Sequence, residues 1–148
     1  MAKEPSTTFV ETVAKDFASG LHCSQVTLAY AANKLGYDEK TAKKIGAGFG
    51  GGMFNGERCG ALTGAMMGLG LKYGYTGQKD AENLAVLQQK VKQLEDAFQT
   101  YYASLQCEDI IGVNIGTPEG AKKAVENNCF ANCPLLTARV CMILDELL

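Results

Sequence analysis

The sequence predicts an all-α fold, a compact helical bundle of about six to seven helices with a glycine-rich loop and a glycine-spaced central helix. Three observations predict it. Apolar residues recur at helical three- and four-residue intervals, strand-like alternation is scarce, and capping residues precede several of the periodic segments. The chain of 148 residues shows no linker or repeat, so residues 1–148 are expected to form one domain around one core.

The first three helices are expected from their apolar spacing and their caps. Residues 8–17 place several apolar side chains on one helix face. Ser24 is a candidate cap for a second helix that continues to about Leu35. Asp38 is the expected cap of a short third helix over residues 39–47, whose basic residues near the C-terminal end suit the helix dipole.

The middle of the chain is rich in glycine, with twelve of the seventeen glycines between positions 46 and 77. A loop over residues 46–56 is expected, followed by a helix from about Gly60 to Tyr73. In that helix Gly60, Gly64 and Gly68 leave one face almost without side chains, at a cost of roughly 1 kcal/mol per interior glycine relative to alanine. Such a face suits the close approach of another helix, within the chain or across a dimer, or of a bulky inorganic group.

The last part of the chain is expected to be helical as well. An amphipathic pattern predicts a long helix over about residues 84–101. Cys107 begins a further turn, Thr117 and Pro118 begin another helix, and Pro134 begins the last one, which runs to the C-terminus.

Composition and charge exclude several classes of function. The formal net charge is −2 and no block of Lys or Arg occurs, which argues against binding of nucleic acid or of an anionic membrane surface. No apolar run follows the N-terminal lysine, and the longest weakly polar stretch, residues 60–71, is too short to span a bilayer. We therefore expect a cytoplasmic protein. In that reducing compartment, six cysteines indicate metal binding or redox chemistry rather than structural disulfides.

Four of the six cysteines share one kind of position, because each stands where a helix is expected to begin. These four are Cys23, Cys59, Cys107 and Cys133. The unpaired N–H groups and the positive end of the helix dipole favour an anion there, so we expect the thiols to be shifted towards thiolate, the form that binds metal. Cys141 lies within a helix and is interpreted as core packing. Cys129 is a possible reserve ligand or resolving thiol.

Several neighbours of these cysteines are candidates for a supporting role. His22 either contacts a sulfur or is simply solvated, and Arg58 either balances the charge of a cluster or is a surface residue. Gly60 and Ala61 follow Cys59 directly. The loop residues Gly51 and Gly52 tolerate positive φ angles, so they can bend backbone amides around an anion or a cluster.

These features together resemble a known family. The matching segments are Leu21-His-Cys23-Ser-Gln-Val, Gly48-Phe-Gly-Gly-Gly52-Met, Cys59-Gly-Ala-Leu-Thr-Gly64, Cys107, and Cys133-Pro-Leu-Leu, over about residues 9–148. The sequence resembles the C-GCAxxG-C-C family, named for its cysteine pattern, whose proposed role is redox. It is also similar to the cluster-binding part of split-Soret cytochromes, which implies a [2Fe–2S] cluster on the four matching cysteines, Cys23, Cys59, Cys107 and Cys133. One departure is the order Cys59-Gly60-Ala61 in place of Gly-Cys-Ala.

The leading hypothesis is an iron–sulfur protein for electron transfer or redox sensing, with four cysteine ligands and an unknown redox partner protein. A [2Fe–2S] cluster is preferred and a [4Fe–4S] cluster is the second choice. Zinc is less favoured because the chain has no pair of cysteines separated by two residues. The alternatives are a cluster-free thiol/disulfide protein and a structural metal-binding or dimerising helical module, with a homodimer possible. No acid–base constellation suggests an enzyme with its own substrate.

Overall fold

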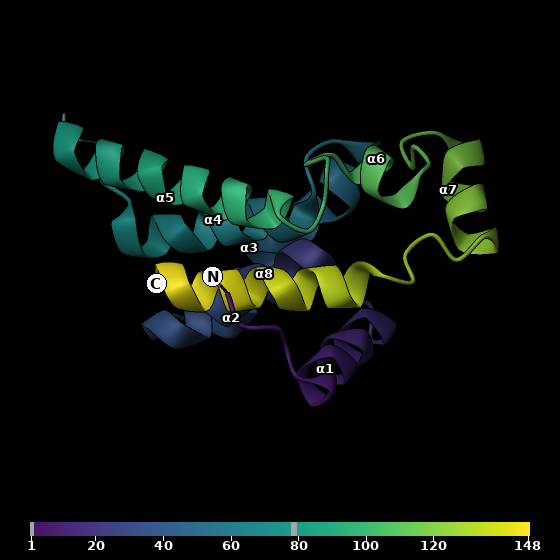
Figure 1. The fold of residues 1–148 in the computed structure, drawn as a ribbon, viewed down its shortest axis with the longest axis horizontal. Helices are drawn as coiled ribbons and strands as arrows, with labels where there is room; N and C mark the ends of the chain where they lie inside the picture. Colours follow the sequence, from purple (N-terminus) through teal and green to yellow (C-terminus); the bar gives the residue numbers. More distant parts are fainter. Residues whose placement is uncertain (1, 78–79) are drawn as a thin grey trace.

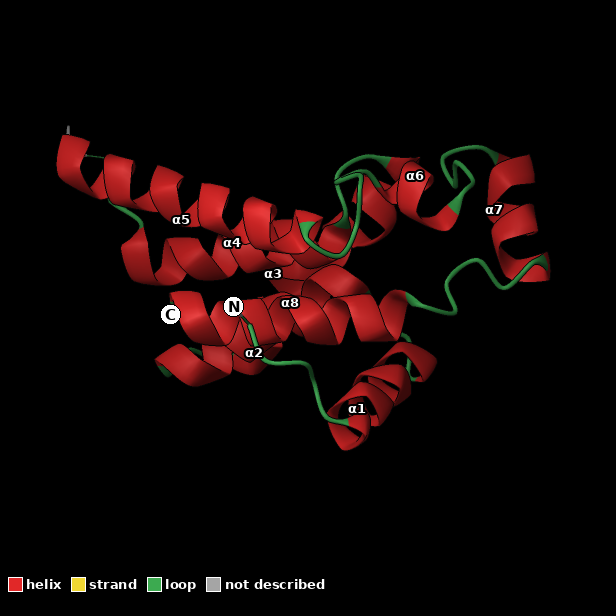
Figure 2. Ribbon diagram, in the orientation of Figure 1, coloured by secondary structure: helices red, strands yellow, loops and turns green. Residues whose placement is uncertain are grey.

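The structure, a computed structural model, describes residues 2–77 and 80–148 and confirms the all-α prediction. Figure 2 shows helices joined by loops, and the one extended pairing in the described part of the chain is a single antiparallel bridge between Arg58 and Gln106. The α-helices are α1 (Thr7–Ala18), α2 (Cys23–Leu35), α3 (Glu39–Gly46), α4 (Gly60–Tyr73), α5 (Ala81–Gln99), α6 (Cys107–Ile111), α7 (Pro118–Glu126) and α8 (Cys133–Leu147). The described residues thus hold eight α-helices, more than the six to seven expected.

The long helices α2, α4, α5 and α8 form the body of the bundle. In Figure 1, α5 runs along one side with α4 beneath it. Helix α2 packs directly on α4, and α8 contacts α2, α4 and α5. The main core consists of buried side chains from α4, α5 and α8. Its largest members are Leu62, Leu69, Leu94, Phe98, Leu136, Val140, Ile143 and Leu144. Helix α1 packs against α8, while α7 lies at the far end of the molecule beyond α6 (Figure 1).

Helix starts follow the predicted caps, with one exception. The side chains of Asp38 and Thr117 accept backbone N–H groups at the starts of α3 and α7, as expected. Ser24 is not a cap, because α2 begins one residue earlier, at Cys23. The Ser24 hydroxyl is instead buried and donates to the Gly46 carbonyl at 2.7 Å, which ties α2 to the end of α3.

The glycine-spaced face of α4 packs against α2 of the same chain. A Cβ atom at Gly64 would lie 2.4 Å from the Ser24 carbonyl oxygen, and one at Gly68 would lie 2.4 Å from Ala31 Cβ. Side chains at these positions would therefore push α2 away. Two packing alternatives were expected for this face, another helix of the same chain or a second copy of the chain. The structure shows the first. Because α2 covers the face, the prediction of a dimer through Gly64 is wrong.

The glycine-rich segment between α3 and α4 is more regular than the expected loop. It contains a 3₁₀ turn over Ala47–Phe49 and a wider turn over Gly52–Gly56. Four successive residues, Gly51 to Phe54, have φ angles between 57° and 64°, in the left-handed region. Two of them, Met53 and Phe54, are not glycine, and left-handed backbone costs such residues about 1–2 kcal/mol each.

No helix within the described ranges combines the length and the apolar character that crossing a membrane requires.

The packing of α4 on α2 predicts opposite effects for two glycine substitutions in one helix. Gly64→Ala should lower the free energy of unfolding by about 1–3 kcal/mol, because the new methyl group meets the backbone of α2. Gly70→Ala is the matched control. It has open space around it and should raise the free energy by up to about 1 kcal/mol. Urea unfolding of both variants measures the difference, and equal effects would contradict the packing.

Candidate functional site

The four cysteines at the helix starts border one cavity of about 370 Å³. Each stands where the sequence places it. Cys23, Cys107 and Cys133 are the first residues of α2, α6 and α8, and Cys59 is the cap residue of α4. Residues separated by up to 110 positions, from Cys23 to Cys133, thereby meet at one site.

The remaining wall of the cysteine cavity is largely apolar. Its other lining residues are Phe17, Gly20, Leu21, His22, Gly51, Gly60, Ile110, Ile111, Phe130, Leu136 and Thr137. They come from α1, α4, α6, α8 and the connecting segments. The site is therefore assembled by the whole fold, and no single loop carries it.

Backbone hydrogen bonds hold Cys59 and Cys107 side by side. The Cys59 N–H donates to the Leu105 carbonyl at 2.9 Å, and the Cys107 N–H donates to the Glu57 carbonyl at 2.6 Å. These bonds flank the bridge between Arg58 and Gln106, so two short segments lie antiparallel at this point. The pairing joins the start of α4 to the start of α6.

Gly60 allows Cys23 to approach the start of α4. A Cβ atom at Gly60 would lie 2.6 Å from Cys23 Sγ and 2.8 Å from the Phe49 carbonyl oxygen. Neither contact is possible between real atoms, so any larger residue at this position would displace the Cys23 sulfur. Gly60 is thus required by the arrangement of the thiols as well as by the packing of α4.

Backbone N–H groups point at two of the sulfurs. The donors to Cys23 include the N–H groups of Gly51, Ser24 and Ala61, and those to Cys59 are the N–H groups of Ala61 and Leu62. They belong to the first turns of α2 and α4 and to the left-handed turn. Such donors stabilise negative charge on sulfur, as expected from the position of the cysteines at helix starts.

Burial raises the pKa of these thiols by more than the N–H donors lower it. The expected shift towards thiolate is therefore wrong for the metal-free protein. Burial raises the pKa of Cys23 and, more strongly, that of Cys59, whose pKa the neighbouring Cys23 raises further. Burial and the proximity of Cys23 raise the pKa of Cys107 to about 11 and that of Cys133 to about 12. The metal-free thiols are therefore protonated at neutral pH. A bound cation would displace their protons, since metals bind the thiolate form.

The thiols are not gathered as the ligands of one ion would be. Over residues 2–77 and 80–148, no group of three or more His, Cys, Asp or Glu side chains has an arrangement that could hold a single metal ion. The four cysteines instead line one cavity from the starts of four helices.

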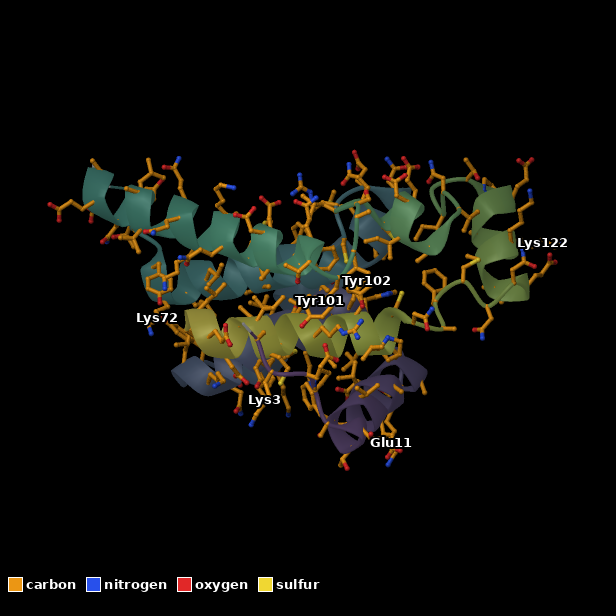
Figure 3. All side chains as sticks on the ribbon, in the orientation of Figure 1. Lys3, Glu11, Lys72, Tyr101, Tyr102 and Lys122 are labelled. Atoms are coloured by element: carbon orange, nitrogen blue, oxygen red, sulfur yellow. The ribbon has the colours of Figure 1, made fainter. Side chains whose placement is uncertain are left out.

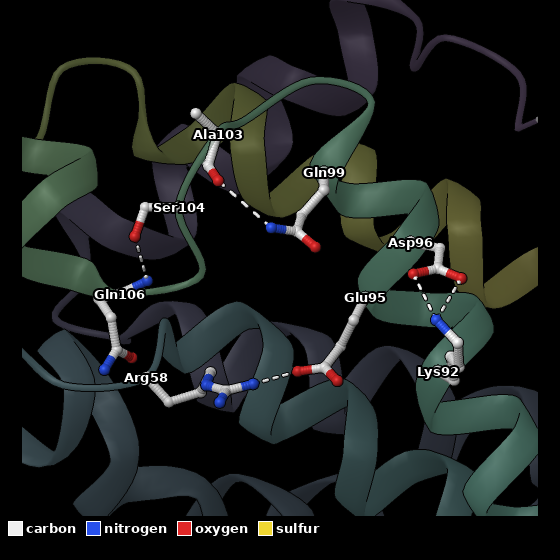
Figure 4. Close-up of polar contacts among 8 residues, drawn as sticks. All are labelled: Arg58, Lys92, Glu95, Asp96, Gln99, Ala103, Ser104 and Gln106. Carbon is white, nitrogen blue, oxygen red and sulfur yellow. Dashed lines mark hydrogen bonds and ion pairs between the residues drawn. The ribbon is translucent and has the colours of Figure 1, made fainter.

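Of the two predicted neighbours His22 and Arg58, only His22 lines the cavity. His22 lines the cavity, and its ring packs edge-on against Phe54 with 5.6 Å between the ring centroids. Arg58 points away and forms an ion pair with Glu95 of α5, shown in Figure 4. The guanidinium is thus paired with a carboxylate and does not line the cavity, which favours the alternative of a surface residue for Arg58.

The loop glycines also differ from one another. Gly51 lines the cavity, while Gly52 is buried beside it. A Cβ atom at Gly52 would lie 2.3 Å from the Glu57 backbone nitrogen, so only glycine fits there.

The two remaining cysteines do not line the cavity of the other four. Cys141 is fully buried in α8, which confirms its interpretation as core packing. Cys129 lines a neighbouring cavity of about 410 Å³ together with Cys133. Tyr101 and Tyr102, which Figure 3 places between α5 and α8, line this second cavity as well. Cys133 thus borders both cavities.

Four residues that line the cysteine cavity were not predicted from the sequence: Ile110, Ile111, Phe130 and Thr137. Ile110 and Ile111 follow Cys107 within α6, and Thr137 follows Cys133 by one helical turn in α8. The four-residue interval between Cys133 and Thr137 was the available signal, because residues at that spacing share one helix face. Nothing in the sequence indicates that Phe130 reaches the same cavity.

The raised pKa values predict slow, strongly pH-dependent alkylation of the metal-free thiols. A pKa near 11 in place of 9.0 lowers the thiolate fraction of Cys107 about a hundredfold at neutral pH. With iodoacetamide and mass spectrometry of the labelled peptides, the rates at Cys107 and Cys133 should rise with pH until about 11 and 12. The urea-unfolded chain is the control, with a midpoint near 9. Coinciding profiles in the folded and unfolded chains would contradict the effect of burial.

The comparisons with known proteins agree with the cysteine pattern. The family model described as "Putative redox-active protein (C_GCAxxG_C_C)" matches residues 21–147, which include all four cysteines of the cavity. No curated protein and no solved structure matches the chain. The likeness to split-Soret cytochromes therefore stays a prediction. On the match over most of its length, the chain belongs to the C_GCAxxG_C_C family of putative redox-active proteins.

Proposed function

We propose that this redox-active protein holds an iron–sulfur cluster on Cys23, Cys59, Cys107 and Cys133 and exchanges electrons with a partner protein. The observation that carries the proposal is the meeting of these four thiols, from four helix starts, on the wall of one cavity. A [2Fe–2S] cluster is the preferred occupant and a [4Fe–4S] cluster the second choice. When bound, the cluster supplies one-electron redox chemistry.

Size and chemistry of the cavity support a cluster over a single zinc ion. Four thiolates around one zinc ion lie about 2.3 Å from it. The cysteines here line a cavity of about 370 Å³, whose volume suits a larger body. Thiolates are also the ligands that iron–sulfur clusters use.

The surrounding residues would act on the charge of the occupant. The apolar side chains, among them Phe17, Ile110 and Leu136, would lower the polarity around the occupant. The backbone N–H groups of Gly51 and Ala61 stabilise charge on sulfur. Burial and these donors act on the reduction potential in opposite directions, since burial disfavours added negative charge and the donors favour it.

The site supports an electron carrier more than an enzyme with its own substrate. Apart from His22, the cavity holds no ionisable side chain other than the thiols among its lining residues. We propose a cytoplasmic location, where the thiols would stay reduced until metal is bound. A homodimer through a surface other than the Gly64 face remains a proposal.

The proposal predicts which cysteines bind iron. Protein reconstituted anaerobically with ferrous iron and sulfide should contain both and absorb in the visible range. Alanine at any of the four cavity cysteines should abolish or strongly reduce the bound iron and sulfide. Cys141→Ala and Cys129→Ala are the controls, because Cys141 lies in the core and Cys129 in the neighbouring cavity. Colourless wild-type protein without iron, or equal loss in all six variants, would contradict the assignment.

A second candidate function, thiol–disulfide chemistry, is favoured by one observation. Cys129 and Cys133 line the same second cavity, and neither lies in a disulfide bond. Oxidation by a small disulfide would join their sulfurs and release two molecules of the corresponding thiol. The bond would remove Cys133 from the cluster.

This alternative predicts a specific disulfide in the metal-free protein. Incubation with oxidised glutathione should link Cys129 to Cys133, which peptide mapping after alkylation detects as one new cross-linked pair. Cys129→Ala should leave Cys133 free for alkylation after the same treatment. If the other cavity cysteines cross-link instead, or if no pair forms, the alternative fails while the cluster proposal is unaffected.

A further inference from the structure

Thr137 of α8 lines the cysteine cavity one helical turn after Cys133. It follows Cys133 by four residues in α8, so the two side chains lie on the same face of the helix, one turn apart. Both line the cavity that Cys23, Cys59 and Cys107 also border. Thr137 and His22 are the only polar side chains in this wall besides the thiols.

The hydroxyl group of Thr137 is buried without a partner. Its side chain is 0% exposed, and within the described part of the chain Oγ1 is the one buried side-chain oxygen or nitrogen that makes no hydrogen bond. The other two buried polar side chains differ. Ser24 donates to the Gly46 carbonyl at 2.7 Å, and Thr27 donates to the Cys23 carbonyl at 3.4 Å.

An unpaired buried hydroxyl destabilises the protein that carries it. Threonine in a helix can relieve this cost by donating to the carbonyl four residues before, which for Thr137 is that of Cys133, and no such bond is present. Valine has nearly the same shape without the polar atom. The threonine is therefore unfavourable in the metal-free protein and favourable only if its partner comes from outside the chain.

The nature of that partner follows from the cavity. A group bound by four cysteines presents negatively charged sulfur towards the cavity wall, both as thiolate and, in a cluster, as inorganic sulfide. Sulfur of this kind accepts hydrogen bonds and has no proton to donate. A hydroxyl suits it because it has a proton to donate. The apolar neighbours, such as Ile111 and Leu136, have none.

We propose that the Thr137 hydroxyl donates a hydrogen bond to a sulfur atom of the group that occupies the cysteine cavity. This inference rests on the proposed cluster function. The bond stabilises negative charge on that sulfur, so it makes the reduced cluster more favourable and raises the reduction potential. It also slows loss of the cluster. Thr137 is thus a positioning and tuning residue rather than a ligand.

Thr137→Val tests the inference through two measurements that should change in opposite directions. In the metal-free protein the free energy of unfolding should stay equal or increase, because an unpaired buried hydroxyl is removed. In the reconstituted protein the reduction potential should fall, and the rate of sulfide release should rise about tenfold, as expected for one hydrogen bond to a charged group. Thr137→Ser should restore the potential.

Thr27→Val is the matched control, because its hydroxyl is buried and already bonded. This variant should lower the stability of the metal-free protein. If Thr137→Val lowers that stability to the same extent, the hydroxyl already has a partner and the inference is overturned. Unchanged potential and sulfide release in loaded Thr137→Val overturn it as well. Wild-type protein that takes up no iron and sulfide overturns the cluster function and this inference together, whereas the first two outcomes leave the function intact.

Discussion

The close contact between α4 and α2 is the constraint on which the cysteine cavity depends. Gly64 and Gly68 bring the two helix backbones together, and Gly60 extends the same face to Cys23. Because of this approach, the start of α4 carries Cys59 to the side of the Cys23 sulfur. Small residues therefore have a double role here, since they permit the packing of the bundle and the meeting of two thiols.

The second constraint is the balance between burial and backbone N–H groups at the sulfurs. Buried thiols hold their protons, and their proximity strengthens this effect, because two neighbouring thiolates repel each other. Metal centres bound by these thiols would remove the repulsion and offset the cost of burial. The same features that make the metal-free cysteines poor nucleophiles thus favour an occupant with positive metal centres.

The left-handed turn from Gly51 to Phe54 is linked by backbone hydrogen bonds to both Cys23 and Cys107. It directs the Gly51 N–H towards Cys23, and the Gly52 carbonyl accepts the Glu57 N–H at 3.3 Å. The Glu57 carbonyl in turn accepts the N–H of Cys107. Strained backbone persists where surrounding contacts hold it, and it is often found at functional sites. In this protein it connects two of the four cysteines.

Local sequence signals determined the helices, the caps of α3 and α7 and the position of four cysteines at helix starts, because spacing and capping act within a few residues. The burial of Cys141 follows from the same signals. Only the tertiary structure decided that α2 covers the glycine face, that Arg58 pairs with Glu95, and that Cys129 faces a different cavity. It also decided that Thr137 lies unpaired in the wall. These features depend on contacts between distant segments, whose relative positions are set by the packing of the whole bundle.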